Sequence, residues 1–103
     1  MNAFAALAEP RRRAILSLVR DAPRAASDIA GEFPEITQQA VSLHLKALAD
    51  AGLVEVRPSG RQRLYVLRPE GLGPVREYLE APWPERLQLL KEAVEREVHG
   101  DRR

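Results

Sequence analysis

A change in the repeat of apolar residues at Gly52 is the feature that most constrains this fold. Between Thr37 and Ala51 no glycine or proline interrupts the chain, and apolar residues recur at helical spacing. After Gly52 come two short strand-like runs, Val54–Arg57 and Arg61–Leu67, separated by a Pro-Ser-Gly tip. This switch from a helical period to a period of about two residues predicts a helix that ends at Gly52, followed by a β-hairpin.

The predicted helix has one apolar face and one polar face. Thr37 is a suitable N-cap because its hydroxyl can accept from the first free backbone N–H groups. At about 100° per residue, Val41, Leu45 and Leu48 share one face, which we expect to be buried. The opposite face therefore lies in solvent.

Short polar side chains without negative charge occupy the first turns of that solvent face. A glutamine can bond bidentately to adenine, a serine hydroxyl can bond to several base edges, and an exposed leucine can lie against a thymine methyl group. Lys46 lies about one turn beyond Ser42, where it can meet a phosphate. The helix is therefore predicted to read base edges in a major groove through Gln38, Gln39, Ser42 and Leu43.

The hairpin after this helix is basic. Residues 36–68 hold five basic and two acidic residues, whereas residues 1–35 are neutral and residues 69–103 carry a surplus of two negative charges. Arg61 and Arg63 are the charges nearest the hairpin tip, and they could also be plain solvated strand residues. Because a helix followed by a basic hairpin is the winged helix-turn-helix arrangement, we favour contacts of both arginines with the minor groove or its phosphates.

Four segments of the chain carry a family resemblance. They are Phe4–Leu16 (FAALAEPRRRAIL), Val41–Leu48 (VSLHLKAL), Ala51–Val54 (AGLV) and Gly60–Tyr65 (GRQRLY). In this order and at these spacings they resemble the ArsR family of winged-helix repressors, over the stretch from Phe4 to Leu67. The part from Trp83 onward is similar to the last helix of the ArsR subgroup often encoded beside START-like lipid-binding proteins.

The resemblance implies a mainly α-helical winged helix-turn-helix fold with a small β-hairpin wing. The expected order is two helices, an optional short strand, two more helices, two strands and a last helix. Ser27 is a candidate cap for the third helix, expected over Asp28–Phe33, and a helical turn or two is expected over Leu72–Leu79. The whole chain is one domain, 1–103, with dimerisation helices over 1–9 and 83–98, the helix-turn-helix over 28–51 and the wing over 53–67.

Apolar residues in the last helix recur at alternating spacings of four and three, the pattern of a helix packed on another helix. Such a seam can belong to the core of one chain or to an interface. In the resembled family the first and last helices pair across a two-fold axis, which implies a homodimer here. The residues expected in this contact are Phe4, Leu7, Trp83, Leu87, Leu90 and Val94.

No metal or other cofactor is expected. The chain contains no cysteine, which removes disulfides and thiolate ligands together. In metal-sensing members of the resembled family a Cys-x-Cys pair aligns with Ala25–Ser27, where none of the three residues is a soft-metal ligand. His99 has no second histidine or carboxylate set around it. These departures argue against a sensor of arsenic, cadmium, lead or zinc.

Further function classes are disfavoured by the same sequence. The serines have no histidine and acid arranged for nucleophilic catalysis, and no glycine-rich phosphate loop is present, so we expect no enzyme. We see neither a secretion signal nor an apolar run of about 20 residues, so we expect a cytoplasmic protein without a membrane partner.

The sequence leaves several alternatives open. Arg11–Arg13 form a solvated cluster or contact flanking phosphates. His44 is a hydrogen-bonded packing residue that supports the base-reading helix over 37–51, here called the reading helix, or it approaches the DNA backbone. The favoured partner is an operator in double-stranded DNA. The two rival functions are a ligand- or metal-responsive sensor of the same fold and a winged-helix module that binds proteins. The polar face at Gln38–Ser42 argues against the protein-binding module, since protein interfaces usually present apolar or aromatic anchors.

Overall fold

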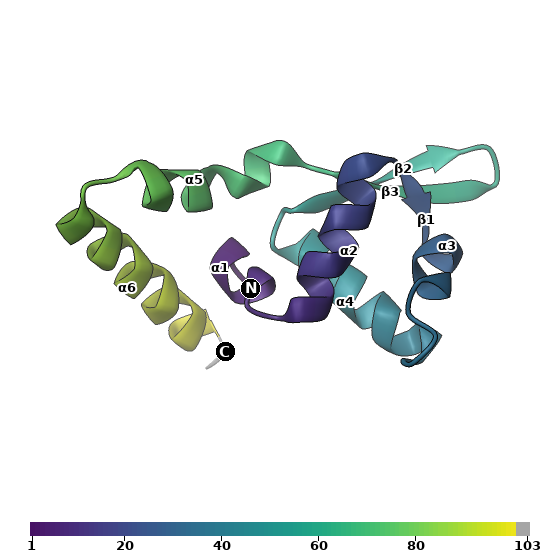
Figure 1. Ribbon diagram of the computed structural model, residues 1–103, viewed down its shortest axis with the longest axis horizontal. Helices are drawn as coiled ribbons and strands as arrows, with labels where there is room; N and C mark the ends of the chain where they lie inside the picture. Colours follow the sequence, from purple (N-terminus) through teal and green to yellow (C-terminus); the bar gives the residue numbers. More distant parts are fainter. Residues whose placement is uncertain (101–103) are drawn as a thin grey trace.

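The computed structural model describes residues 1–100, with side chains as far as residue 98. Helices α1 to α4 and a small sheet form the body, and α5 and α6 form an arm that folds back toward α1 (Figure 1). The elements are α1 (Ala3–Leu7), α2 (Pro10–Asp21), β1 (Arg24–Ala25), α3 (Ala26–Gly31), α4 (Gln38–Asp50), β2 (Val54–Ser59), β3 (Gln62–Leu67), the 3-10 helix η1 (Pro69–Leu72), α5 (Gly73–Glu80) and α6 (Trp83–Gly100). This confirms the predicted winged helix-turn-helix fold. Within the described residues, no helix is both long and apolar enough to cross a bilayer.

Both ends of α4 are fixed by the residues that the sequence indicates. The Thr37 hydroxyl oxygen accepts from the Ala40 N–H at 3.0 Å. At the other end Gly52 adopts a φ of +76°, a left-handed conformation that glycine reaches without a steric penalty. The Leu53 N–H can then donate back to the Leu48 carbonyl at 2.9 Å, which closes the helix as a Schellman motif.

The three strands form one antiparallel sheet in the order β1-β3-β2. The short strand β1, left optional by the sequence, is present and pairs Arg24 with Tyr65. The predicted Pro-Ser-Gly tip is wrong, because β2 continues through Pro58 and Ser59 and the chain turns at Gly60 and Arg61. Since β2 is an edge strand, the N–H that Pro58 lacks is not needed for a ladder bond.

Two further boundaries differ from the sequence-based expectation. Helix α3 starts at Ala26 instead of Asp28, and no side chain caps it, because β1 leads directly into its first turn. Ser27 therefore lies inside the helix and does not cap it. The chain after β3 forms an eight-residue helix, α5, which agrees with the helical turn or two expected over Leu72–Leu79, although the expected order of elements did not count it as a helix. The final helix is thus α6, and it extends past the expected end at 98 to Gly100.

The core gathers under α4. Val41, Leu45 and Leu48, the predicted buried stripe, are all at most 1% exposed. Ile15 from α2 and Ile29 from α3 are fully buried in the same cluster. Because this stripe is locked between neighbouring helices, the rotation of α4 about its axis is fixed and its opposite face is held in solvent.

Arginines in the first turn of α2 bond to the C-terminal end of the preceding helix, α1. Arg12 Nε donates to the Ala6 carbonyl at 2.7 Å, and Arg13 Nη1 donates to the Leu7 carbonyl at 2.8 Å. The last carbonyls of a helix have no partner inside the helix and carry partial negative charge, so cations stabilise them. Arg12 and Arg13 are therefore caps of α1, a role that neither open interpretation of the cluster describes.

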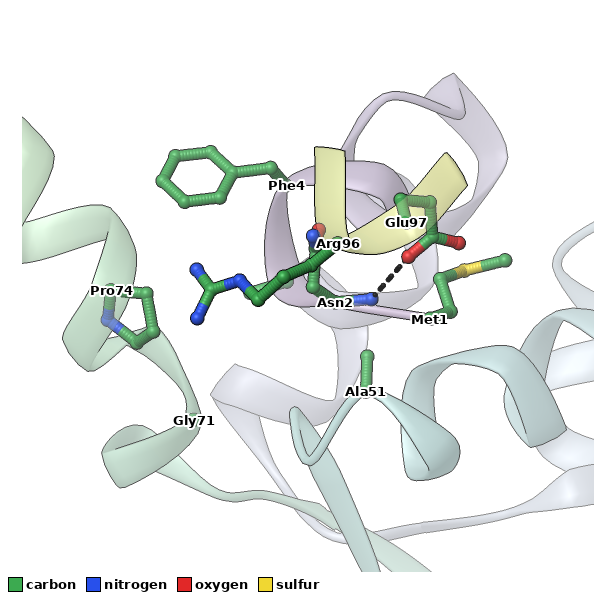
Figure 2. Close-up of a pocket in the computed structure, with 9 residues that line it drawn as sticks. Met1, Asn2, Phe4, Ala51, Gly71, Pro74, Arg96 and Glu97 are labelled. Carbon is green, nitrogen blue, oxygen red and sulfur yellow. Dashed lines mark hydrogen bonds between the residues drawn. The ribbon is translucent and has the colours of Figure 1, made fainter. Parts of the chain in front are cut away.

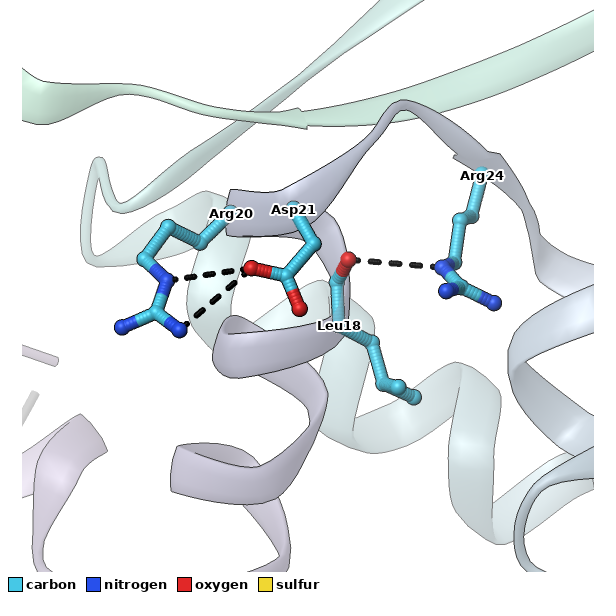
Figure 3. A network of polar contacts seen from close by, with 4 residues as sticks. All are labelled: Leu18, Arg20, Asp21 and Arg24. Atoms are coloured by element: carbon cyan, nitrogen blue, oxygen red, sulfur yellow. Dashed lines mark hydrogen bonds and ion pairs between the residues drawn. The ribbon is translucent and has the colours of Figure 1, made fainter.

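The other end of α2 is tied to β1. Arg24 Nε donates to the Leu18 carbonyl at 3.3 Å, while Arg20 and Asp21 form an ion pair of the same length beside it (Figure 3). The Arg24 side chain thus joins the C-terminal end of α2 to β1, and Arg24 itself pairs with Tyr65 of β3.

Candidate nucleic-acid interface

The four predicted base-reading residues lie together on the exposed face of α4. Gln38, Gln39, Ser42 and Leu43 line one shallow, open depression of about 580 Å³. Leu43 is 69% exposed, although leucine is usually a core residue. A large apolar side chain held in solvent between polar neighbours is chemically suited to a thymine methyl group.

The N-terminal end of α4 is positioned by its neighbours. The Ile36 N–H donates to the Phe33 carbonyl at 3.2 Å, and the turn is held further by an ion pair of 3.3 Å between Arg11 of α2 and Glu35. The first turn of α4 contains no acidic residue. The free N–H groups there carry partial positive charge, so this end of the helix is compatible with a phosphate.

The cations around this face fall into two sets. Lys46 Nζ lies 2.9 Å from the Asp50 carboxylate, in an i,i+4 pair that the sequence spacing could have indicated. Arg57, which sequence reasoning did not place in the site, lies 2.8 Å from the Glu55 carboxylate. Within the described residues, Arg61 and Arg63 form no ion pair. These two wing arginines therefore remain available for a phosphate.

Register places the wing cations on different sides of the hairpin. Arg57 lies opposite Leu64, and Arg63 lies opposite Pro58. Because side chains alternate along a strand, Arg57 and Arg63 occupy opposite faces. Arg61 lies in the turn, at the tip. The hairpin tip and the N-terminal end of α4 both lie at the end of the molecule remote from α6 (Figure 1).

The residues predicted for a dimer contact divide by exposure. On α6, Trp83 is 60%, Leu87 50% and Val94 54% exposed, while Leu90 is half-buried. Val98 extends this exposed stripe by one more turn and was missed by sequence reasoning, although its spacing of four from Val94 indicates it. One face of α6 is therefore apolar and uncovered within a single chain.

The two expected contact residues of α1 have internal partners. The Phe4 ring meets the edge of the Tyr78 ring, with centroids 5.8 Å apart and planes at 86°. Leu7 is half-buried and packs against the core. Phe4 and Leu7 thus contribute to the attachment of α1 inside one chain, whereas the residues of α6 leave more surface free.

No group of three or more His, Cys, Asp or Glu side chains that could hold a metal ion occurs in the described part of the chain. The expectation for His99 lies outside the described side chains. His44 is half-buried at the edge of the core stripe of α4, the position expected of a packing residue.

The helix pair α3–α4, the polar face of α4 and the basic hairpin define a winged helix-turn-helix DNA-binding domain. Residues 7–57 match the model of a family described as "Helix-turn-helix domain". The HTH-type transcriptional regulator Rv2034 of Mycobacterium tuberculosis is 38% identical over 96 residues, which are 93% of this chain and 89% of the relative. The chain belongs to the ArsR family of winged helix-turn-helix transcriptional regulators, and it is a DNA-binding transcriptional regulator.

Solved structures share the fold. A protein described as "Possible transcriptional regulator for arsenical resistance" superposes with a TM-score of 0.71 at 33% identity, over 89% of this chain and 96% of the other. An ArsR-like transcriptional regulator from Rhodococcus sp. RHA1 superposes with a TM-score of 0.69 at 35% identity, over 87% of both chains. A homodimeric winged helix-turn-helix DNA-binding domain from Mycobacterium bovis superposes with a TM-score of 0.60 at 34% identity, over 69% of this chain and 65% of the other.

Proposed function

We propose that this regulator is a homodimeric repressor that binds a palindromic operator and blocks the promoter that contains it. The observation that carries this proposal is the exposed, acid-free first half of the α4 face, with Gln38, Gln39, Ser42 and Leu43 around one shallow depression. Amides, a hydroxyl and an apolar group together can distinguish base pairs by their edges in the major groove.

Each protomer inserts α4 into a major groove, where those four side chains meet base edges. Lys46, Arg61 and Arg63 neutralise phosphates around them, with the wing tip on the flanking minor groove. Neutralised phosphates release counterions, so operator affinity falls steeply with salt. A single α4 contacts few base pairs, and two half-sites about one helical turn apart supply the remaining specific contacts.

The exposed apolar stripe of α6 supports the dimer. Trp83, Leu87 and Val94 face solvent in one chain, and contact with a second copy would remove their surface from water. The relative from Mycobacterium bovis is a homodimeric domain. Since α6 lies at the end of the molecule remote from the wing, a two-fold axis there leaves both α4 faces free (Figure 1).

We propose no catalytic activity, and we propose that the protein acts in the cytoplasm, where it binds its operator.

The decisive experiment is selection of bound fragments from the source genome by the purified protein, with affinity followed at two salt concentrations. Enrichment of an imperfect palindrome whose affinity falls as salt rises supports the proposal and identifies the targets. Repression is then tested by transcription from an enriched promoter with and without the protein. If no DNA sequence is enriched and binding is weak at both salt concentrations, α4 does not read DNA.

A further inference from the structure

A half-open cavity of about 440 Å³ lies where four parts of the chain meet, and it is separate from the DNA-binding face. Its walls come from α1, the end of α4, the segment from η1 into α5, and α6 (Figure 2). This volume is in the range of pockets that hold small molecules, which combine apolar walls with a few polar groups that fix the orientation of the ligand.

One side of the cavity combines a cation with two apolar rings. The Arg96 side chain extends from α6 toward Pro74, and the Phe4 ring lies on the same side (Figure 2). Within the described residues, Arg96 forms no ion pair. The neighbouring carboxylate of Glu97 is directed to the other side and accepts from the Asn2 N–H at 2.9 Å. The free charge of this side is therefore positive.

The cavity does not coincide with the apolar stripe that supports the dimer. At about 100° per residue, Arg96 lies on the side of α6 opposite Trp83, Leu87 and Val94. A second copy packed on that stripe leaves the Arg96 side of the helix uncovered. The Arg96 side of α6 is thus separate from the apolar stripe of the proposed dimer contact.

The cavity also touches the end of the reading helix. Ala51, which lines it, is the C-cap residue of α4. Gly71 of η1 packs directly on the turn that follows, since a Cβ atom at Gly71 would overlap the Gly52 carbonyl oxygen. The backbone that leads into α5 therefore rests on the backbone that ends α4. A molecule in the cavity would contact α6, α5 and the end of α4 at once, and would favour those positions of the arm relative to α4 in which these contacts are best.

We propose that this cavity binds a small carboxylate with an apolar or aromatic body, and that binding weakens operator affinity. The carboxylate pairs with the Arg96 guanidinium, a geometry that suits two parallel hydrogen bonds, while the body lies against Phe4 and Pro74. Occupancy moves the arm that carries the dimer stripe, and this changes the spacing of the two α4 helices. The second half of this inference rests on the proposed homodimeric repressor.

The binding half is tested on the protein alone by following backbone amide NMR signals during titration with benzoate and with 4-phenylbutyrate, and with neutral 4-phenylbutyramide for comparison. We expect 4-phenylbutyrate to shift the signals of Ala51, Gly71 and the neighbours of Arg96, with a Kd on the order of 1 mM for a ligand of this size. The amide should bind at least about 10-fold more weakly, because it lacks the charge that Arg96 pairs with.

Two variants decide whether Arg96 is the anchor. In Arg96→Gln the affinity for 4-phenylbutyrate should fall about 10-fold or more, whereas Arg76→Gln, the same change on an exposed residue of α5 that does not line the cavity, should leave it unchanged. Absence of shifts at the cavity with both acids, or equal binding by Arg96→Gln and the parent protein, overturns the site.

The regulatory half is tested with a selected operator, by fluorescence anisotropy in 4-phenylbutyrate and in sodium chloride of matched ionic strength, because salt alone weakens DNA binding. We expect the acid to weaken binding at least about 5-fold beyond the chloride control, and to have no such effect on Arg96→Gln. If the acid binds the cavity but operator affinity equals that of the control, the regulatory half is wrong. If no DNA binds at all, the proposed repressor function fails while the NMR result for the cavity stands.

Discussion

At the scale of single residues, Gln39 tests whether α4 reads sequence. The side chain is exposed beside Ser42 and can bond bidentately to adenine. We expect Gln39→Ala to weaken operator binding by roughly 1–3 kcal/mol and to relax the sequence preference at one base pair in each half-site. Fluorescence anisotropy with operator and random duplexes measures both effects. Equal losses on the two duplexes would show that Gln39 does not read bases.

Arg61 tests whether the wing contributes sequence-independent binding to phosphates. It lies at the wing tip without an ion pair in the described part of the chain, so its expected partner is a phosphate, which is the same in every sequence. We expect Arg61→Ala to weaken operator and random DNA alike, and to lower the slope of log affinity against log salt by about 1 per protomer. A salt titration of both duplexes checks this. An unchanged slope would remove Arg61 from the phosphate contacts.

The Asp50 carboxylate competes with DNA phosphates for the Lys46 ammonium group. An exposed ion pair stabilises a protein by roughly 0–1 kcal/mol, so Lys46 can leave the Asp50 carboxylate and pair with a DNA phosphate at little cost. Without the carboxylate, Lys46 can pair with the phosphate and breaks no ion pair to do so. We expect Asp50→Asn to strengthen binding to random DNA about 2- to 5-fold and to steepen its salt dependence. Binding of random duplexes measured at several salt concentrations tests this expectation.

Two controls separate this effect from a general change in net charge. Glu92→Gln removes the same charge from α6, remote from the DNA-binding face, and should leave random binding unchanged. In a Lys46→Gln background, Asp50→Asn should lose most of its effect, because the lysine that it releases is absent. A gain that persists in this background would assign the effect of Asp50 to direct repulsion of DNA.

At the scale of elements, the contact between η1 and the end of α4 depends on a residue without a side chain. A Cβ atom at Gly71 would overlap the Gly52 carbonyl, whereas a Cβ atom at Gly73 would meet nothing within 4 Å among the described residues beyond its chain neighbours and its own helix backbone. We expect Gly71→Ala to destabilise the fold by roughly 1–3 kcal/mol through overpacking, and Gly73→Ala to have a much smaller effect. Urea unfolding of the two variants measures the difference. Equal midpoints would mean that the arm does not rest on this turn.

Element positions were predictable where local chemistry decides them. Thr37 and Gly52 bound α4 by capping, and the change of period after Gly52 indicates the hairpin. The tip was misplaced because Pro58 is tolerated only on an edge strand, and the order of strands is a property of the sheet and not of the hairpin sequence. The expected order of elements omitted α5, because its half-buried residues find their partners on other elements.

At the scale of the whole molecule, the dimer is tested through the exposed stripe of α6. Leu87 is half exposed at the centre of that stripe. We expect Leu87→Asp to shift the protein toward monomer in sedimentation velocity, because burial of a carboxylate in an apolar contact is costly. Operator affinity should fall with it, since one α4 alone meets one half-site.

Gln88→Asp is the matched control for this substitution. It introduces the same charge one residue further along α6, at a side chain that reaches along the outer face to Glu92 at 3.1 Å. This variant should retain both the dimer and the operator affinity. If Leu87→Asp remains dimeric at micromolar concentration, the stripe is not the contact and another surface joins the two protomers.

The sequence by itself determined the parts of this protein that depend on neighbours along the chain. Helix periodicity separates the buried stripe of α4 from its polar face. The burial of that stripe leaves four side chains in solvent, those of Gln38, Gln39, Ser42 and Leu43. The basic character of the wing and the family membership are likewise legible in short segments with fixed spacing. These properties are local, so they do not require knowledge of which distant elements meet.

Only the tertiary structure decided which side chains find distant partners. Arg12 and Arg13 bond to the carbonyls of α1, and Arg11 pairs with Glu35. Arg96 lies beside the Phe4 and Pro74 rings in one cavity. These contacts join residues separated by several to about 90 positions in the chain, and they depend on how α5 and α6 fold back over the end of α4. Pattern along a sequence fixes the face of an element, whereas its partners follow from the packing of all elements together.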